Sequence, residues 1–293
     1  GNHTELRAGL RSGGQSVERE IGTPDLPEIS GEGYGGVSLR LVRDTRDRDV
    51  LWQQGTLLRV EDGVGILSFN RPERLNAVTW DVARDLVERL RALRTRDEVR
   101  TLVLTGEGRA FCSGGDAEWL AGSAERGMPG LSDAPLERYQ RKTPAGPIAE
   151  LVRMLVEVEK PVIAALHGPV MGVGLAFALA CDRRFADPTT RMCAAMVRLG
   201  FAPDCGITWL LAHVARLPTA LMMVTTGRIL ESDACLREGL VDELVEPGQD
   251  LPAALAYAKE LARGPSVAID LARRFVWKSL TATLDEMLDY EAV

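Results

Sequence analysis

The sequence predicts an α/β fold in which repeated strand and helix units are followed by a helical tail. Short apolar runs typical of buried strands alternate with segments whose apolar residues recur at helical spacing, and beyond residue 204 the pattern is mainly helical. With 293 residues, 45% of them hydrophobic, the chain can fill a sizeable core as one large domain or two small ones.

The first strand and helix unit begins near Gly55. Apolar runs at 57–60 and 64–69 flank Glu61-Asp62-Gly63, a pattern typical of two paired strands around a tight turn. A helix is predicted after Thr79, a residue that caps helices well. Its apolar face is formed by Val82, Leu86, Leu90 and Leu93. The apolar run 101–105 then predicts a strand, which completes a β-α-β unit.

A second unit follows a predicted mobile loop over 121–147, where Gly, Pro, Ser and charged residues mix. The helix after this loop carries an apolar face formed by Ile148, Leu151, Val152, Leu155 and Val158. Residues 162–166 predict a strand that runs into a glycine-rich turn and an apolar helix from about Gly172 to Cys181. Two amphipathic helices, 251–263 and 267–280, are separated by Gly264-Pro265.

The chain divides by composition into three parts. Residues 1–53 mix Gly, Ser, Pro and charges of both signs without sustained periodicity, which predicts a flexible N-terminal arm. Residues 54–250 form the predicted core, and residues 251–293 form a C-terminal helical region.

Charge and cysteine content exclude several classes of function. A formal net charge of -7 argues against a nucleic-acid partner. Five cysteines without metal-ligand spacing and three histidines predict no metal site, and they favour reduced thiols in a cytoplasmic compartment. The N-terminal residues lack an apolar signal-peptide core. The apolar segment 161–181 is interrupted by prolines, glycines and a histidine, so we expect a buried strand and helix and no membrane partner.

Two glycine-bearing turns each follow a predicted strand and lead into a helix. They are Phe111-Cys112-Ser113-Gly114-Gly115-Asp116 and His167-Gly168-Pro169-Val170-Met171-Gly172-Val173-Gly174. Glycine allows close backbone approach, and a helix N-terminus offers unpaired N–H donors. Taken alone, each sequence is typical of an ordinary turn after a strand. Taken together, the two turns can form an oxyanion hole.

These turns, in this order, resemble the crotonase (enoyl-CoA hydratase/isomerase) superfamily. The resemblance covers roughly residues 57–291. It also rests on Asn70-Arg71-Pro72-Glu73-Arg74-Leu75-Asn76-Ala77, Lys160-Pro161-Val162-Ile163-Ala164-Ala165, Ala180-Cys181-Asp182 and Leu199-Gly200-Phe201-Ala202-Pro203-Asp204. It implies a spiral of β-β-α turns, a C-terminal trimerisation region, a homotrimer or dimer of trimers, and an acyl-CoA thioester substrate bound in a bent form.

The resemblance implies that the oxyanion N–H groups belong to Gly115 and Val173, and that no cofactor is needed beyond the CoA moiety of the substrate. The CoA-binding residues that it implies are Arg71, Arg74, Leu75, Ala77, Ser113, Gly114 and Asp116. Arg71 and Arg74 would approach the CoA phosphates, although both suit solvated turn positions equally well. Asp116 also suits a helix cap.

The family's hydratases carry two active-site glutamates, and the matching positions here are Ala176 and Met196. Neither side chain can accept a proton or orient a water molecule, which argues against ordinary hydration. Asp204 matches the acidic residue of several isomerases and of the aromatic dehalogenase branch, so it is the candidate base. A competing interpretation is that Asp204, after Pro203, only caps a helix.

The leading prediction is therefore an acyl-CoA double-bond isomerase that passes through a thioester enolate. A dehalogenase ranks lower because Met196 stands where that branch has a tryptophan. An atypical enoyl-CoA hydratase, a carbon–carbon lyase, a decarboxylase and a non-catalytic CoA-binding or scaffold protein stay open. Two remaining residues have structural interpretations: His167 as a hydrogen-bonded histidine at a strand end, and Cys112 as a packed thiol.

Overall fold

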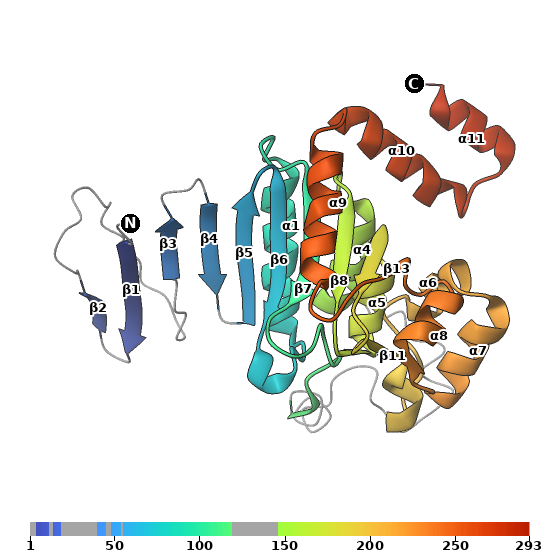
Figure 1. Cartoon of the computed structure of the whole chain (residues 1–293), viewed down its shortest axis with the longest axis horizontal. Helices are drawn as coiled ribbons and strands as arrows, with labels where there is room; N and C mark the ends of the chain where they lie inside the picture. The colour runs from blue at the N-terminus through green and yellow to red at the C-terminus, as the bar shows by residue number, and fades with distance from the viewer. Residues whose placement is uncertain are drawn as a thin grey trace.

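A long mixed sheet runs through the protein (Figure 1). A computed structural model describes residues 4–11, 14–18, 40–44, 48–53, 55–118 and 146–292, with side chains from Gly55 onward. Among the described strands the order in this sheet is β13-β10-β8-β7-β6-β5-β4-β3-β1-β2. The arrangement of strands and helices confirms the predicted α/β class.

The sheet changes from antiparallel to parallel at β6. The predicted hairpin is present: β5 (Gly55–Glu61) and β6 (Val64–Asn70) pair antiparallel around Asp62 and Gly63, which both have positive φ. From β6 onward the neighbouring strands are parallel. These strands are β7 (Thr101–Gly106), β8 (Val162–Leu166), β10 (Arg183–Ala186) and β13 (Glu243–Leu244). The carboxyl ends of β7 and β8 therefore lie side by side, where each leads into a glycine-bearing turn.

The other half of the sheet comes from the N-terminal part of the chain. It contains β4 (Arg48–Gln53), β3 (Arg40–Asp44), β1 (Thr4–Arg11) and β2 (Gly14–Glu18), all antiparallel to their neighbours. Residues 1–53 show no sustained strand periodicity, so these strands were not predicted. The flexibility of this region and the division at residue 54 stay predictions.

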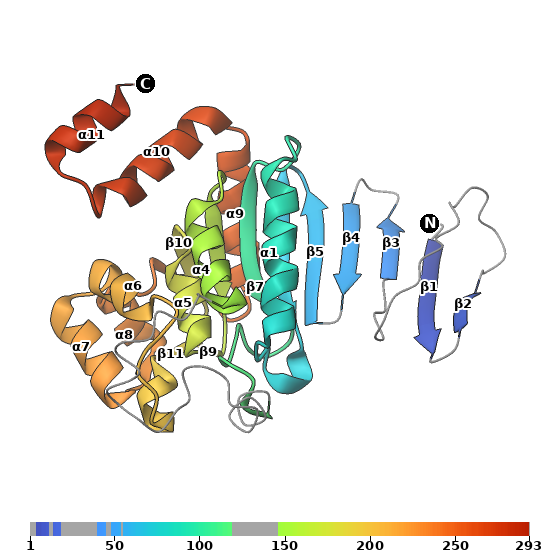
Figure 2. The ribbon, with the colours of Figure 1, turned by 180° about the vertical axis from the view of Figure 1, so that it is seen from behind.

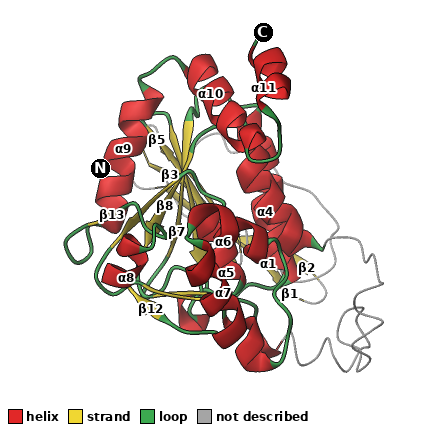
Figure 3. Cartoon of the chain, turned by 90° about the vertical axis from the view of Figure 1, so that its right-hand side faces the viewer, coloured by secondary structure: helices red, strands yellow, loops and turns green. Residues whose placement is uncertain are grey.

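Helices cover both faces of the parallel half. Figure 3 shows the sheet between α9 (Asp250–Ala262) on one side and α1 (Trp80–Arg94) and α4 (Pro147–Glu157) on the other. Alternate residues of each strand enter separate cores: Leu102 and Leu104 face α1 and α4, whereas Val103 faces α9. The side chain of Thr79 accepts a hydrogen bond from the N–H of Val82, which confirms the predicted cap of α1.

A smaller sheet and several helices follow the second turn. The small sheet consists of β9 (Pro169–Met171), β11 (Arg191–Cys193) and β12 (Leu230–Glu231). The helical elements beyond it are α5 (Val173–Leu179), η2 (Ala195–Leu199), α6 (Ile207–Val214), α7 (Leu217–Thr226) and α8 (Ser232–Arg237). At the end of the chain, α10 (Ser266–Ser279) and α11 (Leu284–Glu291) project away from the sheet (Figures 1 and 2).

The apolar segment 161–181 forms β8, β9 and α5, as the interruptions in its sequence predicted. Across the described ranges, no helix combines the length and the apolar character needed to cross a bilayer. The loop predicted over 121–147 falls almost entirely outside the described residues.

Candidate functional site

The first glycine-bearing turn rests on the segment that follows β6. The side-chain amide of Asn76 donates hydrogen bonds to the main-chain oxygens of Glu107 (2.9 Å) and Ala110 (2.6 Å). The main-chain oxygen of Leu75 accepts the N–H of Ser113 (2.9 Å). Leu75 and Asn76 both have positive φ, a conformation that asparagine adopts more readily than leucine. The Asn70–Ala77 motif thus fixes the path of the turn after β7.

Backbone hydrogen bonds join the two glycine-bearing turns directly. The N–H of Phe111 donates to the oxygen of His167 (2.8 Å), and that of Cys112 donates to Pro169 (3.1 Å). In return the N–H of Met171 donates to the oxygen of Cys112 (2.9 Å). The turns lie far apart in sequence. Because these hydrogen bonds join them, a shift of one turn is expected to move the other.

The two predicted oxyanion donors occupy favourable positions in these turns. Gly115 lies between two hydrogen bonds made by Val78, one to the oxygen of Gly114 (2.8 Å) and one from the N–H of Asp116 (3.0 Å). Val173 is the first residue of α5, whose leading N–H groups have no partner within the helix. Among the described residues, neither the Gly115 nor the Val173 N–H donates to another backbone oxygen.

The residues just before these donors touch each other. Gly114 (φ +106°) and Gly172 (φ +53°) both adopt conformations that favour glycine. A Cβ atom on Gly172 would lie 3.8 Å from the Cα of Gly114, and one on Gly114 would lie 3.1 Å from the oxygen of Met171. The structure therefore brings the Gly115 and Val173 turns together, as an oxyanion hole requires.

The wall beside the second turn is apolar. Ala176 is fully buried on α5, and Met196 is buried on η2. The Met196 sulfur lies 3.9 Å from the position that a Cβ on Gly172 would take. The position matching one hydratase glutamate therefore lies against the second turn but carries a thioether, which cannot serve as a general base.

Asp204 lies on the segment between η2 and α6 and does not cap the helix. The N-cap of α6 is Gly206, with no side-chain capping bond, and Asp204 contributes only its main-chain oxygen to the N–H of Ile207 (3.1 Å). Asp204 is exposed, and desolvation by neighbouring atoms raises the pKa of its carboxyl above the ordinary value. Hydrogen bonds from the Cys205 thiol and from its own backbone act in the opposite direction.

The two arginines predicted near the CoA phosphates both have acidic partners. Arg71 contacts Asp116 (2.9 Å) and donates to the oxygen of Ala77 (2.7 Å), so it ties the segment after β6 to the first turn. Arg74 forms a bidentate pair with Glu118, with both distances 2.9 Å, at the surface. Arg74 is the more accessible of the two, and its pKa is raised, chiefly by the hydrogen bond to Glu118.

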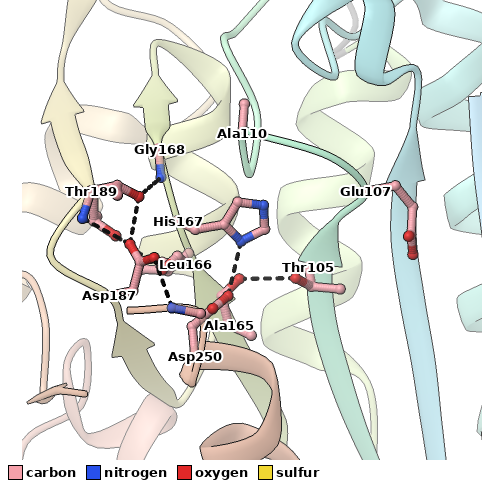
Figure 4. Close-up of polar contacts among 12 residues, drawn as sticks. Thr105, Glu107, Ala110, Ala165, Leu166, His167, Gly168, Asp187, Thr189 and Asp250 are labelled. Atoms are coloured by element: carbon pink, nitrogen blue, oxygen red, sulfur yellow. Dashed lines mark hydrogen bonds and ion pairs between the residues drawn. The ribbon is translucent and has the colours of Figure 1, made fainter. Parts of the chain in front are cut away.

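A cavity of about 540 Å³ opens on the α9 side of the two turns. Its lining includes Leu75, Glu107, Arg109, His167, Asp187 and Asp250. His167 forms a hydrogen bond through Nδ1 to Asp250 Oδ2 (2.9 Å; Figure 4). Neither predicted oxyanion donor lines this cavity, whereas Leu75, one of the residues predicted to bind CoA, does. The hydrogen bond agrees with the structural interpretation of His167.

Two residues of this region were missed by the sequence interpretation. Asn76 lies inside the Asn70–Ala77 motif, so its position could have been singled out, although its two acceptors could not. Asp250 carries no local signal, because it pairs with a histidine 83 residues away.

Cys112 is a packed thiol. It is fully buried, and burial raises its pKa to about 12, which keeps the sulfur protonated at neutral pH. A Cβ on Gly174 would lie 2.9 Å from this sulfur, so the thiol fills space at the start of α5. Among the residues with described side chains, no group of three or more His, Cys, Asp or Glu gathers as a metal site.

Comparison with known proteins gives a consistent family. Residues 59–293 match the family model of enoyl-CoA hydratase/isomerase. The chain is 33% identical over 240 residues to 1,2-epoxyphenylacetyl-CoA isomerase of Escherichia coli K12, covering 80% of this chain and 86% of that protein. It is 28% identical over 237 residues to the short-chain-enoyl-CoA hydratase of Clostridium acetobutylicum, covering 80% and 86% respectively.

Solved structures agree with the sequence matches. The chain superposes on the crystal structure of an enoyl-CoA hydratase from Polaromonas sp. JS666 with a TM-score of 0.71 at 27% identity. The likeness covers 80% of this chain and 88% of that one.

Proposed function

Since the chain belongs to the enoyl-CoA hydratase/isomerase family, we propose that it is an acyl-CoA double-bond isomerase that forms a thioester enolate. Family membership also confirms the predicted crotonase-type fold. The observation that supports the proposal is the close approach of the two glycine-bearing turns at Gly114 and Gly172, just before Gly115 and Val173, whose N–H groups have no backbone acceptor among the described residues.

Two N–H donors suit the charge that develops on a thioester oxygen. When a base removes the proton next to the thioester carbonyl, the electron pair moves onto the oxygen and gives an enolate. Preorganised donors stabilise this charge without reorganisation during the reaction, and removing one donor from a comparable site costs about 3 kcal/mol.

Asp204 is the proposed base. In the isomerase its carboxylate takes a proton from the carbon next to the carbonyl of a 3-enoyl thioester, which gives a dienolate. The same carboxyl group returns the proton two carbons further along, so the double bond moves and no atom is gained or lost. The raised pKa of Asp204 favours this role, because the carboxylate is a stronger base than an ordinary aspartate.

Alanine and methionine at the two hydratase positions support isomerisation over hydration. Ala176 and Met196 are both buried, and neither can activate a water molecule. Two competing reactions have support from the relatives. An atypical hydratase is favoured by the hydratase names among them, and isomerisation of a ring epoxide is favoured by the Escherichia coli relative. A lyase or decarboxylase would keep the two donors and make Asp204 dispensable.

The CoA moiety of the substrate is proposed to lie along the first turn and the segment before it. Arg74 is exposed and could exchange its Glu118 partner for a phosphate, whereas Arg71 is held by Asp116 and Ala77. Replacing Arg74 with methionine is therefore expected to weaken CoA binding more than replacing Glu118 with glutamine.

A panel of 2-enoyl-, 3-enoyl- and ring-epoxide CoA thioesters tests the proposal, with products identified by mass and NMR. The isomerase interconverts 2-enoyl and 3-enoyl thioesters without a change in mass. A product heavier by one water molecule would identify a hydratase, and loss of carbon dioxide from a suitable thioester would identify a decarboxylase. Tight CoA binding without turnover of any substrate would favour the scaffold.

A further inference from the structure

The short link between β8 and β9 is held by side chains that come from much later in the chain. This link consists of His167 and Gly168, the first two residues of the second turn, and it joins the last residue of β8 to β9. Figure 4 shows that hydrogen bonds approach it from two directions, from the start of α9 and from the segment after β10.

The first of these tethers is the pair formed by His167 and Asp250. The Nδ1 atom of His167 lies 2.9 Å from Asp250 Oδ2, and the two side chains are only 15% and 7% exposed. A carboxylate accepts the hydrogen bond, which fixes the proton on Nδ1. The other ring nitrogen, Nε2, is buried and has no partner among the described residues.

The second tether runs through Thr189 and Asp187. The Thr189 hydroxyl accepts the N–H of Gly168 (2.9 Å) and donates to Asp187 Oδ1 (2.6 Å). The other carboxylate oxygen of Asp187 accepts a hydrogen bond from the N–H of Gly248 (3.3 Å). Gly248 lies two residues before Asp250, the first residue of α9. Both tethers thus fasten the link to the same region, the N-terminal end of α9.

This link controls the geometry of both turns because its backbone is part of the ladder between them. The main-chain oxygen of His167 accepts the N–H of Phe111, which begins the first turn, and Gly168 continues into the strand that precedes Gly172. We propose that His167 and Asp250 are positioning residues that set the relative placement of the Gly115 and Val173 N–H groups. The inference rests on the proposed enolate chemistry and extends it to a pair that does not touch the substrate.

The hydrogen bond between His167 and Asp250 is not needed to hold α9 on the sheet, because α9 also packs against the sheet through apolar side chains. Ala254 and Ala258 are fully buried against the core that contains Val103 and Ile163. Cutting the hydrogen bond is therefore expected to leave α9 docked and to change the turns. A misplacement of the donors by about 1 Å can lower the reaction rate about 100-fold.

The test measures how well the protein holds an enolate, which does not depend on the natural reaction. Acetoacetyl-CoA is an acidic thioester whose enolate has its own ultraviolet absorption. The affinity for CoA alone measures binding by the part of the site that does not contact the enolate. For His167→Leu we expect the bound enolate signal and the affinity for acetoacetyl-CoA to fall about 10- to 100-fold. The affinity for CoA should stay within about twofold. His167→Asn should retain the signal, because its amide nitrogen takes the place of Nδ1.

The matched control is Asp242→Asn. Asp242 also accepts hydrogen bonds across elements, from the N–H (2.8 Å) and the side chain of Arg184, but it lies outside the link between the turns. It should leave the enolate signal unchanged. If His167→Leu does not fold, Asp250→Asn keeps the size of the side chain, removes its charge, and should give a weaker loss in the same direction.

Two outcomes overturn the inference: an unchanged enolate signal in folded His167→Leu, or an equal loss in His167→Leu and His167→Asn. A wild-type protein that binds CoA but never holds the enolate would instead refute the proposed function. The two failures are therefore distinguishable.

Discussion

Single residues decide where the two backbone donors lie. Gly114 and Gly172 pack against each other immediately before Gly115 and Val173, and both need conformations that other residues rarely adopt. The proposed donors are main-chain groups, so a valine at position 173 is compatible with the proposed chemistry.

Gly114→Ala is predicted to impair the site through both backbone strain and contact. The new Cβ would lie 3.1 Å from the oxygen of Met171, so this oxygen must move by a few tenths of an ångström. We expect about 1–3 kcal/mol of lost stability from the strained φ and a fall in kcat/KM of up to about 100-fold. Gly200→Ala is the control, because Gly200 also has positive φ but open space around it. Activity is measured for both variants, and thermal unfolding gives their stability. An equal loss of activity in the two variants would contradict this explanation.

The pH dependence of the reaction should follow the Asp204 carboxyl. Asp204 acts as a base only when deprotonated, so kcat/KM falls as the pH drops through its pKa. Desolvation raises that pKa, so the acid limb should lie above the ~3.9 of an ordinary aspartate. By the same linkage the folded state binds this proton more tightly than the unfolded state, and stability falls as pH rises through the folded pKa. An acid limb at or below the ordinary value would count against Asp204.

At the scale of elements, Arg273 and Trp277 hold α10 on the core. Arg273 donates to Asp182 (2.6 Å) and to the main-chain oxygens of Val158 (2.7 Å) and Leu155 (2.6 Å). The Trp277 indole N–H also reaches Asp182 (2.9 Å). A helix whose outer face is largely exposed is thereby held beside α4.

Arg273→Met is predicted to destabilise the protein by about 3 kcal/mol, because two main-chain oxygens lose this donor and the Asp182 carboxylate loses its charged partner. Arg84→Met is the control. Arg84 pairs with Asp81 three residues away on the exposed side of α1, so its loss should cost at most about 0.5 kcal/mol. Chemical denaturation measures both, and similar costs for the two variants would show that the Arg273 network contributes little.

Local patterns predicted β5, β6, α1, β7, α4, β8, α5, α9 and α10, because strand and helix periodicity and caps such as Thr79 are properties of short segments. They did not single out the short elements between Arg183 and Leu244. They did not predict the strands in residues 4–53, which lack such periodicity. Nor could they predict the pair of His167 and Asp250 or the placement of Asp204 outside a cap, since tertiary contacts and the left-handed Gly206 decide these features.

At the scale of the whole molecule, α10 and α11 expose apolar side chains that a single chain leaves uncovered. They include Val267, Val276, Leu284 and Leu288. Their exposure supports the prediction, first made from the family resemblance, of a homotrimer or a dimer of trimers.

Light scattering at micromolar concentration should therefore give a mass of three or six chains. Replacing Leu284 and Leu288 with glutamate should lower the mass, because burying two charges in an apolar interface is costly. A strictly monomeric wild-type protein that still binds CoA would refute the predicted assembly.

Hydrogen exchange at the substrate is the sharpest test of an enolate that Asp204 forms and that the Gly115 and Val173 N–H groups hold. A saturated acyl-CoA is incubated with enzyme in D₂O, and deuterium at the carbon next to the thioester is followed by mass and NMR. The wild-type protein should catalyse this exchange, and folded Asp204→Asn should do so about 10²- to 10⁴-fold more slowly while binding CoA equally well. Exchange at the wild-type rate in Asp204→Asn, or no exchange in a wild-type protein that turns over its substrate, would contradict the proposed enolate chemistry.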